Sequence, residues 1–214
     1  MASPGFAVCR DLIAVDELDR LAIASTSPAG ARHLMADSRV AAFARRPDLL
    51  AIAREWLGPA VPFRATLFDK SARRNWLVVW HQDTALPLAA RVDSAEWGPW
   101  SEKAGVIYAH APTWALDQVV ALRIHLDPSG PENGPLRVIP GSQELGVLDD
   151  VDVRRVARET TAVDCLVPRG GILAMRPLLI HSSSKALSDA PRRVLHIEYA
   201  ASLDLGRGAR LAIA

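Results

Sequence analysis

The second part of the chain is a succession of short apolar runs separated by turn residues, and this pattern limits the fold more than any other feature. After Pro62, glycine, proline and asparagine stand between runs rich in valine, leucine and isoleucine. Such runs suit strands, and helices followed by many short strands indicate a β-sandwich or jelly roll backed by helices. The predicted strands are 63–68, 76–81, 118–126, 136–139, 162–167, 171–175, 178–181 and 194–199.

The first quarter of the chain has the periodicity of helices. Apolar residues recur at helical spacing from 15 to 25, and Asp16 is a suitable N-cap. A second helix is expected over 38–45. A third begins at Pro47, a residue that favours the first helical turn, and ends at Gly58.

Length and composition favour a single domain. The chain has 214 residues, of which 50% are hydrophobic, with no internal repeat or linker. We predict one domain over 1–214, with a helical part at roughly 1–60 and a jelly-roll core at 61–201. Residues 84–115 lack a strand pattern, so we expect a long irregular insertion there. Its tryptophans, which we place near the mouth of the barrel, are Trp97, Trp100 and Trp114.

Charge and cysteine content exclude several classes of protein. The 25 basic and 24 acidic residues form no basic stripe or acidic tail, so we expect no nucleic-acid or membrane partner. The apolar runs are too short to span a bilayer, and no secretory signal is visible at 1–8. Cys9 and Cys165 lie far apart and are expected to be free or buried thiols in a cytoplasmic protein.

Polar side chains at the ends of two predicted strands carry the chemistry. Because side chains alternate along a strand, His81 and Asp83 point the same way and Gln82 points opposite. His181 ends another apolar run. Two imidazoles and one carboxylate leave three coordination positions open, which suits a non-haem Fe(II) that binds O2 and a co-substrate. We predict metal ligation by His81, Asp83 and His181.

Arg192 stands eleven residues after His181, beyond a polar turn. An antiparallel return over that distance brings its guanidinium beside the metal face, where it can bind a carboxylate bidentately. Ser183 shares the face of His181 and can add a hydroxyl to the same carboxylate. Arg123, in the run 118–126, is a further candidate for a co-substrate or an acidic substrate, and a salt bridge at the sheet surface explains it equally well.

Other residues compete for these roles. His125 and Asp127 repeat the His-x-Asp spacing, but a turn follows directly, so we expect Asp127 at the end of a hairpin strand. Arg193 is an alternative to Arg192 as the partner of the carboxylate, and the spacing favours Arg192 only moderately. His196 is expected to be a hydrogen-bonded histidine of the barrel. The remaining histidines, expected at the surface, are His33 and His110.

Together these residues resemble the phytanoyl-CoA dioxygenase (PhyH) family of Fe(II)/2-oxoglutarate-dependent oxygenases. The resemblance covers roughly residues 60–200. It rests on His81-Gln82-Asp83, on the Asn-Gly-Pro-Leu-Arg-Val-Ile-Pro-Gly-Ser stretch at 133–142, and on His181-Ser182-Ser183 followed by Arg192. The fold it implies is a double-stranded β-helix, a jelly roll with helices packed on the larger sheet. It assigns iron ligation to His81, Asp83 and His181. It assigns the distal carboxylate of 2-oxoglutarate to Arg192 with Ser183.

The activity that the resemblance implies is hydroxylation of a small organic molecule, with consumption of O2 and 2-oxoglutarate and release of succinate and CO2. Asp83 favours hydroxylation or desaturation over halogenation, because the halogenases of the family lack this carboxylate. Two other functions stay open: a non-catalytic jelly-roll protein that binds metal or ligand, and a cupin-like metalloenzyme that does not use 2-oxoglutarate. Arg192 argues against both, since neither needs a carboxylate clamp.

Overall fold

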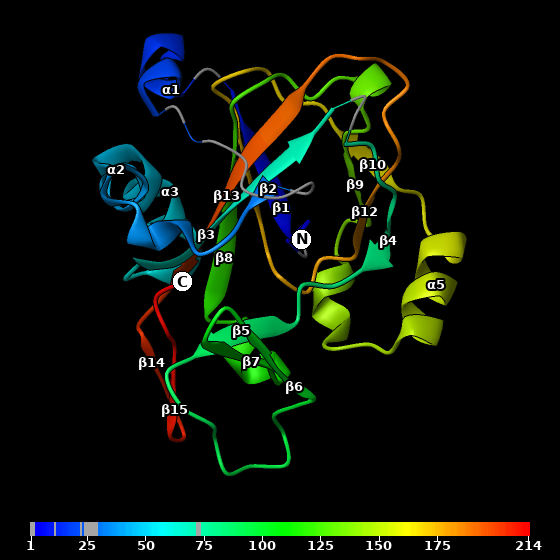
Figure 1. Cartoon of the computed structure of the whole chain (residues 1–214). Coiled ribbons are helices and arrows are strands. Elements are labelled where there is room, and N and C mark those ends of the chain that lie inside the picture. Colours follow the sequence, from blue (N-terminus) through cyan, green and yellow to red (C-terminus); the bar gives the residue numbers. More distant parts are fainter. Residues whose placement is uncertain (1–2, 11, 22, 24–29, 72–73) are drawn as a thin grey trace.

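Two antiparallel sheets face each other in the computed structural model, which describes residues 3–10, 12–21, 23, 30–71 and 74–214 (Figure 1). They form a jelly roll, as the strand pattern predicts. The larger sheet has the order β1 (Phe6–Cys9), β11 (Ile172–Met175), β8 (Val119–His125), β13 (Arg192–Ala200), β3 (Val61–Lys70), β2 (Gly30–Ala31). The smaller sheet has the order β10 (Val163–Cys165), β9 (Leu136–Val138), β12 (His181–Ser183), β4 (Val78–His81).

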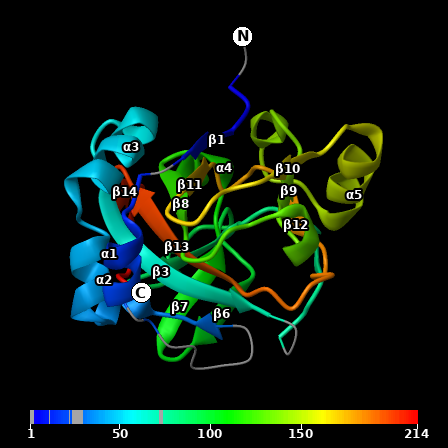
Figure 2. The ribbon, with the colours of Figure 1, turned by 90° about the horizontal axis from the view of Figure 1, so that it is seen from above.

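Three helices cover the outer face of the larger sheet: α1 (Val15–Leu21), α2 (Ser38–Phe43) and α3 (Pro47–Leu57) (Figure 2). The third helix has the predicted bounds. The first begins at Val15, so Asp16 lies in its first turn and not at the N-cap; the predicted end at 24–25 lies outside the described residues. No helix in the described part of the chain has the length and apolarity needed to cross a bilayer.

Strand β13 shows how the helices decide which side chains face the interior. Leu195, Ile197 and Tyr199 pack into the core beneath the helices, and the Tyr199 hydroxyl donates a hydrogen bond to the carbonyl of Ala44 at 2.8 Å. Burial of each large side chain stabilises the fold by about 1.5–3 kcal/mol. The alternate residues therefore point between the two sheets, and besides Val194 three of them are polar. They are Arg192, His196 and Glu198, all buried.

Residues 84–115 form a small sheet, so the prediction of an irregular insertion was wrong. Its strands are β5 (Ala85–Leu88), β7 (Val106–His110) and β6 (Trp100–Lys103), in that spatial order. Prolines and tryptophans obscure the alternation that identifies a strand. Trp97 is 4% exposed and packs edge-on against Trp114, with ring centroids 6.0 Å apart. Trp97 is therefore a core residue, whereas Trp114 is half-buried at the edge of this core and lines an open surface pocket with His110.

The remaining elements connect the sheets. A helix, α5, packs beside β4 on the far side of the molecule from the other helices (Figure 2). The strand expected at 178–181 instead begins at His181, because the chain before it forms a turn in which the Leu179 amide donates to the carbonyl of Arg176 at 3.2 Å. The connecting elements are η1 (Leu34–Ala36), α4 (Thr113–Leu116), η2 (Pro131–Asn133), η3 (Ser142–Leu145), α5 (Asp150–Glu159), β14 (Asp204–Gly206) and β15 (Ala209–Arg210).

The Asn-Gly turn before β9 is held by side-chain and backbone constraints together. The Asn133 side chain accepts a hydrogen bond from the Gly130 amide at 2.9 Å and donates one to the carbonyl of Pro128 at 2.8 Å. Gly134 has φ +66°, and a Cβ there would lie 2.3 Å from the carbonyl oxygen of Ser184. Only glycine fits both the left-handed backbone and the close contact.

Substitution of this glycine is expected to destabilise the protein. Gly134→Ala adds a backbone penalty of about 1 kcal/mol to the cost of displacing Ser184, for a total of about 2–3 kcal/mol. The measurement is the free energy of unfolding in urea. Gly105→Ala is the matched control, because Gly105 has φ +77° but open space around its Cβ position. Equal losses in the two variants would contradict a constraint from Ser184.

Candidate metal centre

The pairing of β4 with β12 brings the three predicted ligands together. His81 and His181 are direct partners in this antiparallel pair. Asp83 follows β4, and its amide is fixed by a 2.9 Å hydrogen bond to the carbonyl of Pro177. The Asp83 carboxylate lies 3.6 Å from Nε2 of each histidine. One donor atom from each residue lies within 4.8 Å of the others, so the three side chains could hold one metal ion.

Backbone carbonyls orient both imidazoles for ligation through Nε2. The Nδ1 atom of His81 lies 2.8 Å from the carbonyl of Val79, and that of His181 lies 2.8 Å from the carbonyl of Leu179. A carbonyl only accepts hydrogen bonds, so Nδ1 donates in each ring and the Nε2 lone pair is free. Such second contacts are characteristic of metal-ligating histidines.

Gln82, between the two ligands of β4, secures the loops behind the metal face. Its Nε2 donates to the carbonyls of Leu178 and Gly146, both at 2.8 Å. Its Oε1 accepts from the amide of Leu148 at 2.9 Å. The Gln82 side chain, which points away from the metal face, therefore fixes the backbone of both ligand-bearing segments.

The charge states of the three residues suit a divalent cation. Burial acts to raise the pKa of Asp83, but His181 and His81 outweigh it and hold that pKa well below its usual range. Burial lowers the pKa of His181 to about 4. Burial also acts to lower the pKa of His81, yet hydrogen bonding and attraction to Asp83 raise it overall. A carboxylate and two imidazoles with unprotonated Nε2 atoms form a donor set suited to Fe(II), and of the three groups His81 is the one that holds its proton most readily and must lose it.

Arg192, Ser183 and Lys70 form a second group in the same interior, which we call the clamp. Arg192 pairs with Lys70 across β13 and β3. The Ser183 hydroxyl accepts from the Arg192 Nη2 at 3.1 Å and from the Lys70 Nζ at 2.9 Å, and donates to the carbonyl of Gly134 at 2.9 Å. The carbonyl of Asn133 accepts from Arg192 Nε at 3.2 Å. The Asn-Gly motif thus supports the clamp through its backbone.

Lys70 is a member of the clamp that the sequence did not reveal. It is 1% exposed, and burial together with the nearby charge of Arg192 lowers its pKa to about 8. Burial lowers the pKa of Arg192 to about 10, with a further contribution from Arg123. No carboxylate pairs with either cation among the described residues. Two buried cations that share one hydroxyl are suited to an incoming carboxylate. The sequence carried no signal for this role, because the strand that ends at Lys70 also contains Arg64, Thr66 and Asp69.

Arg123 faces the interior, not the sheet surface. It is 6% exposed, donates through Nη1 to Nδ1 of His196 at 3.0 Å, and lies over the ring of Phe68 at 5.2 Å. Its Nε atom has no hydrogen-bond partner among the residues described. His196 is thus the hydrogen-bonded barrel histidine that the sequence predicts. The salt-bridge alternative for Arg123 is not realised in the described structure.

The metal face and the clamp open into one cavity of about 80 Å³. Aromatic side chains not singled out from the sequence form its wall beside the charged groups. Trp76 is one of these aromatic residues, and its ring centroid lies 5.5 Å from the Lys70 ammonium. The lining residues are Phe68, Trp76, Val78, His81, Asp83, Arg123, Leu136, His181, Ser183 and Arg192.

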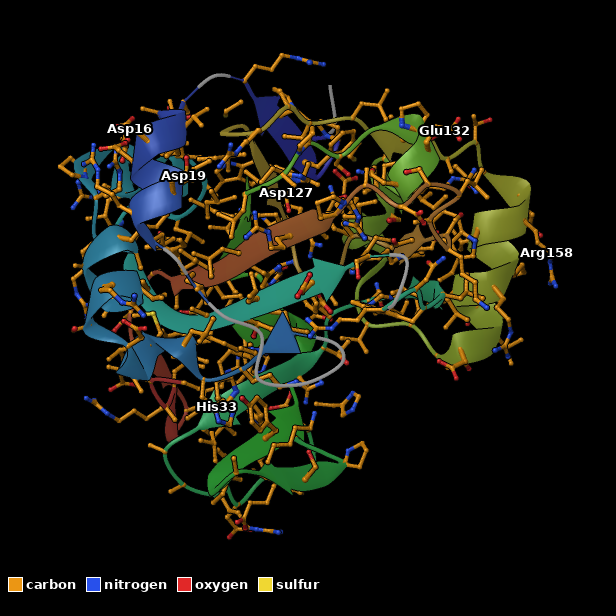
Figure 3. All side chains as sticks on the ribbon, turned by 45° about the horizontal axis from the view of Figure 1, so that its top comes forward. Asp16, Asp19, His33, Asp127, Glu132 and Arg158 are labelled. Atoms are coloured by element: carbon orange, nitrogen blue, oxygen red, sulfur yellow. The ribbon has the colours of Figure 1, made fainter. Side chains whose placement is uncertain are left out.

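The competing candidates have other partners. Asp127 lies at the end of β8, beside the start of β13 (Figure 3), and its two carboxylate oxygens accept from Arg193 at 2.8 Å each. This pair removes Asp127 from any metal face and Arg193 from the clamp. His125 is buried, and its ring nitrogens have no hydrogen-bond partner in the part of the chain that the structure describes; burial and the nearby arginines lower its pKa to about 3.

Comparisons with known proteins agree with this fold. A family model for phytanoyl-CoA dioxygenase (PhyH) matches residues 14–194, and the chain belongs to this family. It is 29% identical over 192 residues to L-proline trans-4-hydroxylase from Streptomyces griseoviridis. That match covers 76% of the chain and 63% of the relative, so the chain spans less than two thirds of the relative's length.

Solved structures share the fold. AviO1 from Streptomyces viridochromogenes is 24% identical, with a TM-score of 0.67 over 99% of this chain and 94% of AviO1. EctD from S. alaskensis, with 2-oxoglutarate and 5-hydroxyectoine, is 20% identical, with a TM-score of 0.66 over 92% and 72% of the two chains. HygX from Streptomyces hygroscopicus, with nickel, 2-oxoglutarate and hygromycin B, is 16% identical, with a TM-score of 0.65 over 92% and 83%.

Metal binding is expected to weaken as the pH falls through the raised pKa of His81. The ion needs the unprotonated Nε2, so apparent affinity should drop about tenfold per pH unit below that pKa. His181 and Asp83 do not limit binding there, because the pKa of His181 is about 4 and the pKa of Asp83 is held well below its usual range. Calorimetric titration with Zn(II) between about pH 5 and pH 8 measures the effect.

A matched control for this pH dependence is His110→Gln, which removes an exposed histidine hydrogen-bonded to Thr84. This variant should keep the wild-type profile, whereas His81→Gln should bind metal weakly at every pH. An affinity that stays constant across the pH range would contradict ligation by His81.

Proposed function

We propose that this protein is an Fe(II)/2-oxoglutarate-dependent dioxygenase that hydroxylates a small organic molecule. The observation that carries the proposal is the clamp of Arg192, Ser183 and Lys70 in the same cavity as the His-Asp-His face. A protein that only binds metal has no need for two buried cations beside the metal site. Membership of the PhyH family supports the same conclusion.

In this proposal Nε2 of His81, Nε2 of His181 and the carboxylate of Asp83 hold Fe(II). When bound, Fe(II) supplies the redox chemistry that couples reduction of O2 and oxidation of 2-oxoglutarate to succinate and CO2 with transfer of one oxygen atom to the substrate. The protein contributes fixed donor atoms, since carbonyls orient both imidazoles and Pro177 anchors Asp83. Asp83 supplies the carboxylate ligand, and loss of this carboxylate would favour halogenation.

We assign the distal carboxylate of 2-oxoglutarate to the clamp. Arg192 and Lys70 carry the positive charge, and Ser183 can turn its hydroxyl from the carbonyl of Gly134 toward the ligand. We assign the end of the co-substrate nearer the metal to Arg123, whose Nε has no hydrogen-bond partner in the described structure. Burial makes each charged hydrogen bond stronger than it would be in water.

The two cysteines support a reducing compartment and hence a cytoplasmic location. Both are free, and burial raises the pKa of Cys165 to about 12, so that its thiol is unreactive. We also retain a single domain over 1–214 as part of the proposal. For the substrate, L-proline is the first compound to test, because the relative from Streptomyces griseoviridis is named for its hydroxylation.

Succinate formation from 2-oxoglutarate, Fe(II) and O2 is the decisive measurement. Wild-type protein should form succinate, and Asp83→Ala should abolish this by removing a ligand. Arg192→Ala should raise the KM for 2-oxoglutarate about 100-fold, since it removes charged hydrogen bonds that contribute about 1.5–3 kcal/mol. Lys70→Ala should raise it about tenfold, because Arg192 remains.

Arg193→Ala is the matched control for the clamp. Arg193 is the neighbour of Arg192 on β13 but pairs with Asp127, so its loss should leave the KM for 2-oxoglutarate unchanged. Tight metal binding without 2-oxoglutarate binding or turnover would contradict the proposal and would favour a non-catalytic jelly-roll protein or a cupin-like metalloenzyme.

A further inference from the structure

Tyr108 is surrounded by basic side chains from three separate segments. It is 4% exposed on β7, and its hydroxyl lies 2.9 Å from Nε2 of His33, whose ring stacks on it at 6.1 Å (Figure 3). The Arg64 guanidinium lies 5.5 Å and the Lys103 ammonium 5.1 Å from the Tyr108 ring centroid. We call these residues, with Arg32, the Tyr108 cluster. His33 is thus a partnered residue and not the isolated surface histidine that we expected.

Positive charge exceeds negative charge in the Tyr108 cluster. Arg64 pairs with Glu198 at 2.9 Å, whereas no ion pair involves Arg32 or Lys103 within the described ranges. Burial lowers the pKa of Lys103, and the charges of Arg32 and Arg64 lower it further. Burial and the same cations, together with Lys103, lower the pKa of His33. Three cations therefore share one carboxylate, and their mutual repulsion would be relieved by a bound anion.

The Tyr108 cluster and the clamp lie at opposite ends of the same pair of strands. In the pairing of β3 with β13, Lys70 faces Arg192 at one end and Arg64 faces Glu198 at the other. Lys70 and Arg64 are six residues apart, about 20 Å along a strand. Phe68 lies between them and lines the cavity of the metal face.

The Tyr108 cluster also adjoins the ligand-bearing segment. Arg64 donates through Nη1 to the carbonyl of Ala85 at 2.9 Å, and Ala85 follows Asp83 by two residues. The Arg64 charge acts on Asp83 as well. With 2-oxoglutarate assigned to the clamp, the side of the metal face toward Arg64 is the side left for the molecule that is oxidised.

We propose that the Tyr108 cluster binds an anionic group, a carboxylate or a phosphate, of the molecule that this protein oxidises. The role of that molecule as substrate rests on the proposed function, whereas anion binding by the cluster does not. Arg64 is partly buried, and its guanidinium is held in one orientation by Glu198 and by the carbonyl of Ala85, so it forms one fixed side of the site. Arg32 and Lys103 are exposed and complete the site from the solvent side.

His33 provides a direct test of anion binding. Its pKa is measured by NMR of the imidazole ring in the full chain, loaded with Zn(II) and 2-oxoglutarate, with added inorganic phosphate, acetate or chloride at equal ionic strength. An anion in the Tyr108 cluster offsets the three cations and should raise the pKa of His33. A response to phosphate alone assigns a phosphorylated ligand, and a response to acetate assigns a carboxylate. No response to either anion beyond chloride overturns the proposal.

Charge-removing variants locate the effect. Lys103→Ala and Arg32→Ala should each raise the pKa of His33 without added anion and weaken the anion response about threefold to fivefold, as expected for one exposed ion pair. Arg91→Ala is the matched control, because Arg91 lies over Trp100 on the neighbouring loop, 5.2 Å from its ring centroid. An Arg91→Ala effect equal to that of Lys103→Ala would overturn the assignment to this cluster.

Turnover then links the anion to the substrate. For a compound that stimulates 2-oxoglutarate consumption, the free acid or phosphate ester should be active, and the amide or unphosphorylated parent should have a KM higher by tenfold or more. Lys103→Ala should raise the KM of the anionic compound and leave the KM for 2-oxoglutarate unchanged. Equal use of the neutral and anionic forms overturns the proposal. A complete absence of 2-oxoglutarate turnover would instead refute the proposed function and leave the His33 titration to decide anion binding.

Discussion

The site depends on the packing of three helices against one face of the larger sheet. Leu195, Ile197 and Tyr199 of β13 are buried beneath these helices. Because side chains alternate along a strand, this packing directs Arg192, His196 and Glu198 into the space between the sheets. Burial of such groups is unfavourable unless they are paired. Their partners, which include Ser183, Arg123 and Arg64, organise the interior into a line of charged groups.

The smaller sheet places the predicted metal ligands opposite these charged groups of the interior. The β4–β12 pair puts His81 opposite His181, and Gln82 fixes the loops behind them. The metal face therefore lies at strand ends of the smaller sheet, which also carries Ser183, while Lys70, Arg192 and Arg123 belong to the larger sheet. A cavity closed by two sheets can present a metal and a bound carboxylate to each other at a fixed separation.

Much of this arrangement could be predicted from local patterns. Short apolar runs indicated a jelly roll, and the spacing in His81-Gln82-Asp83 placed two ligands on one face. Lys70 escaped notice because nothing near it in sequence marks a lysine as buried; its environment comes from Arg192 and Ser183, more than 110 residues away. The small sheet at 84–115 was missed because proline and tryptophan interrupt its alternation.

The sequence by itself determined that His81 and Asp83 share one face, since a strand end and an alternation of two are enough to present these two predicted ligands together. Only the tertiary structure decided which of two His-x-Asp pairs was free for a metal, because Arg193 from another strand binds Asp127. It also decided where charge accumulates around Tyr108. That cluster joins β3, β6, β7 and the segment before η1, and contacts between distant segments are fixed by packing and not by local sequence.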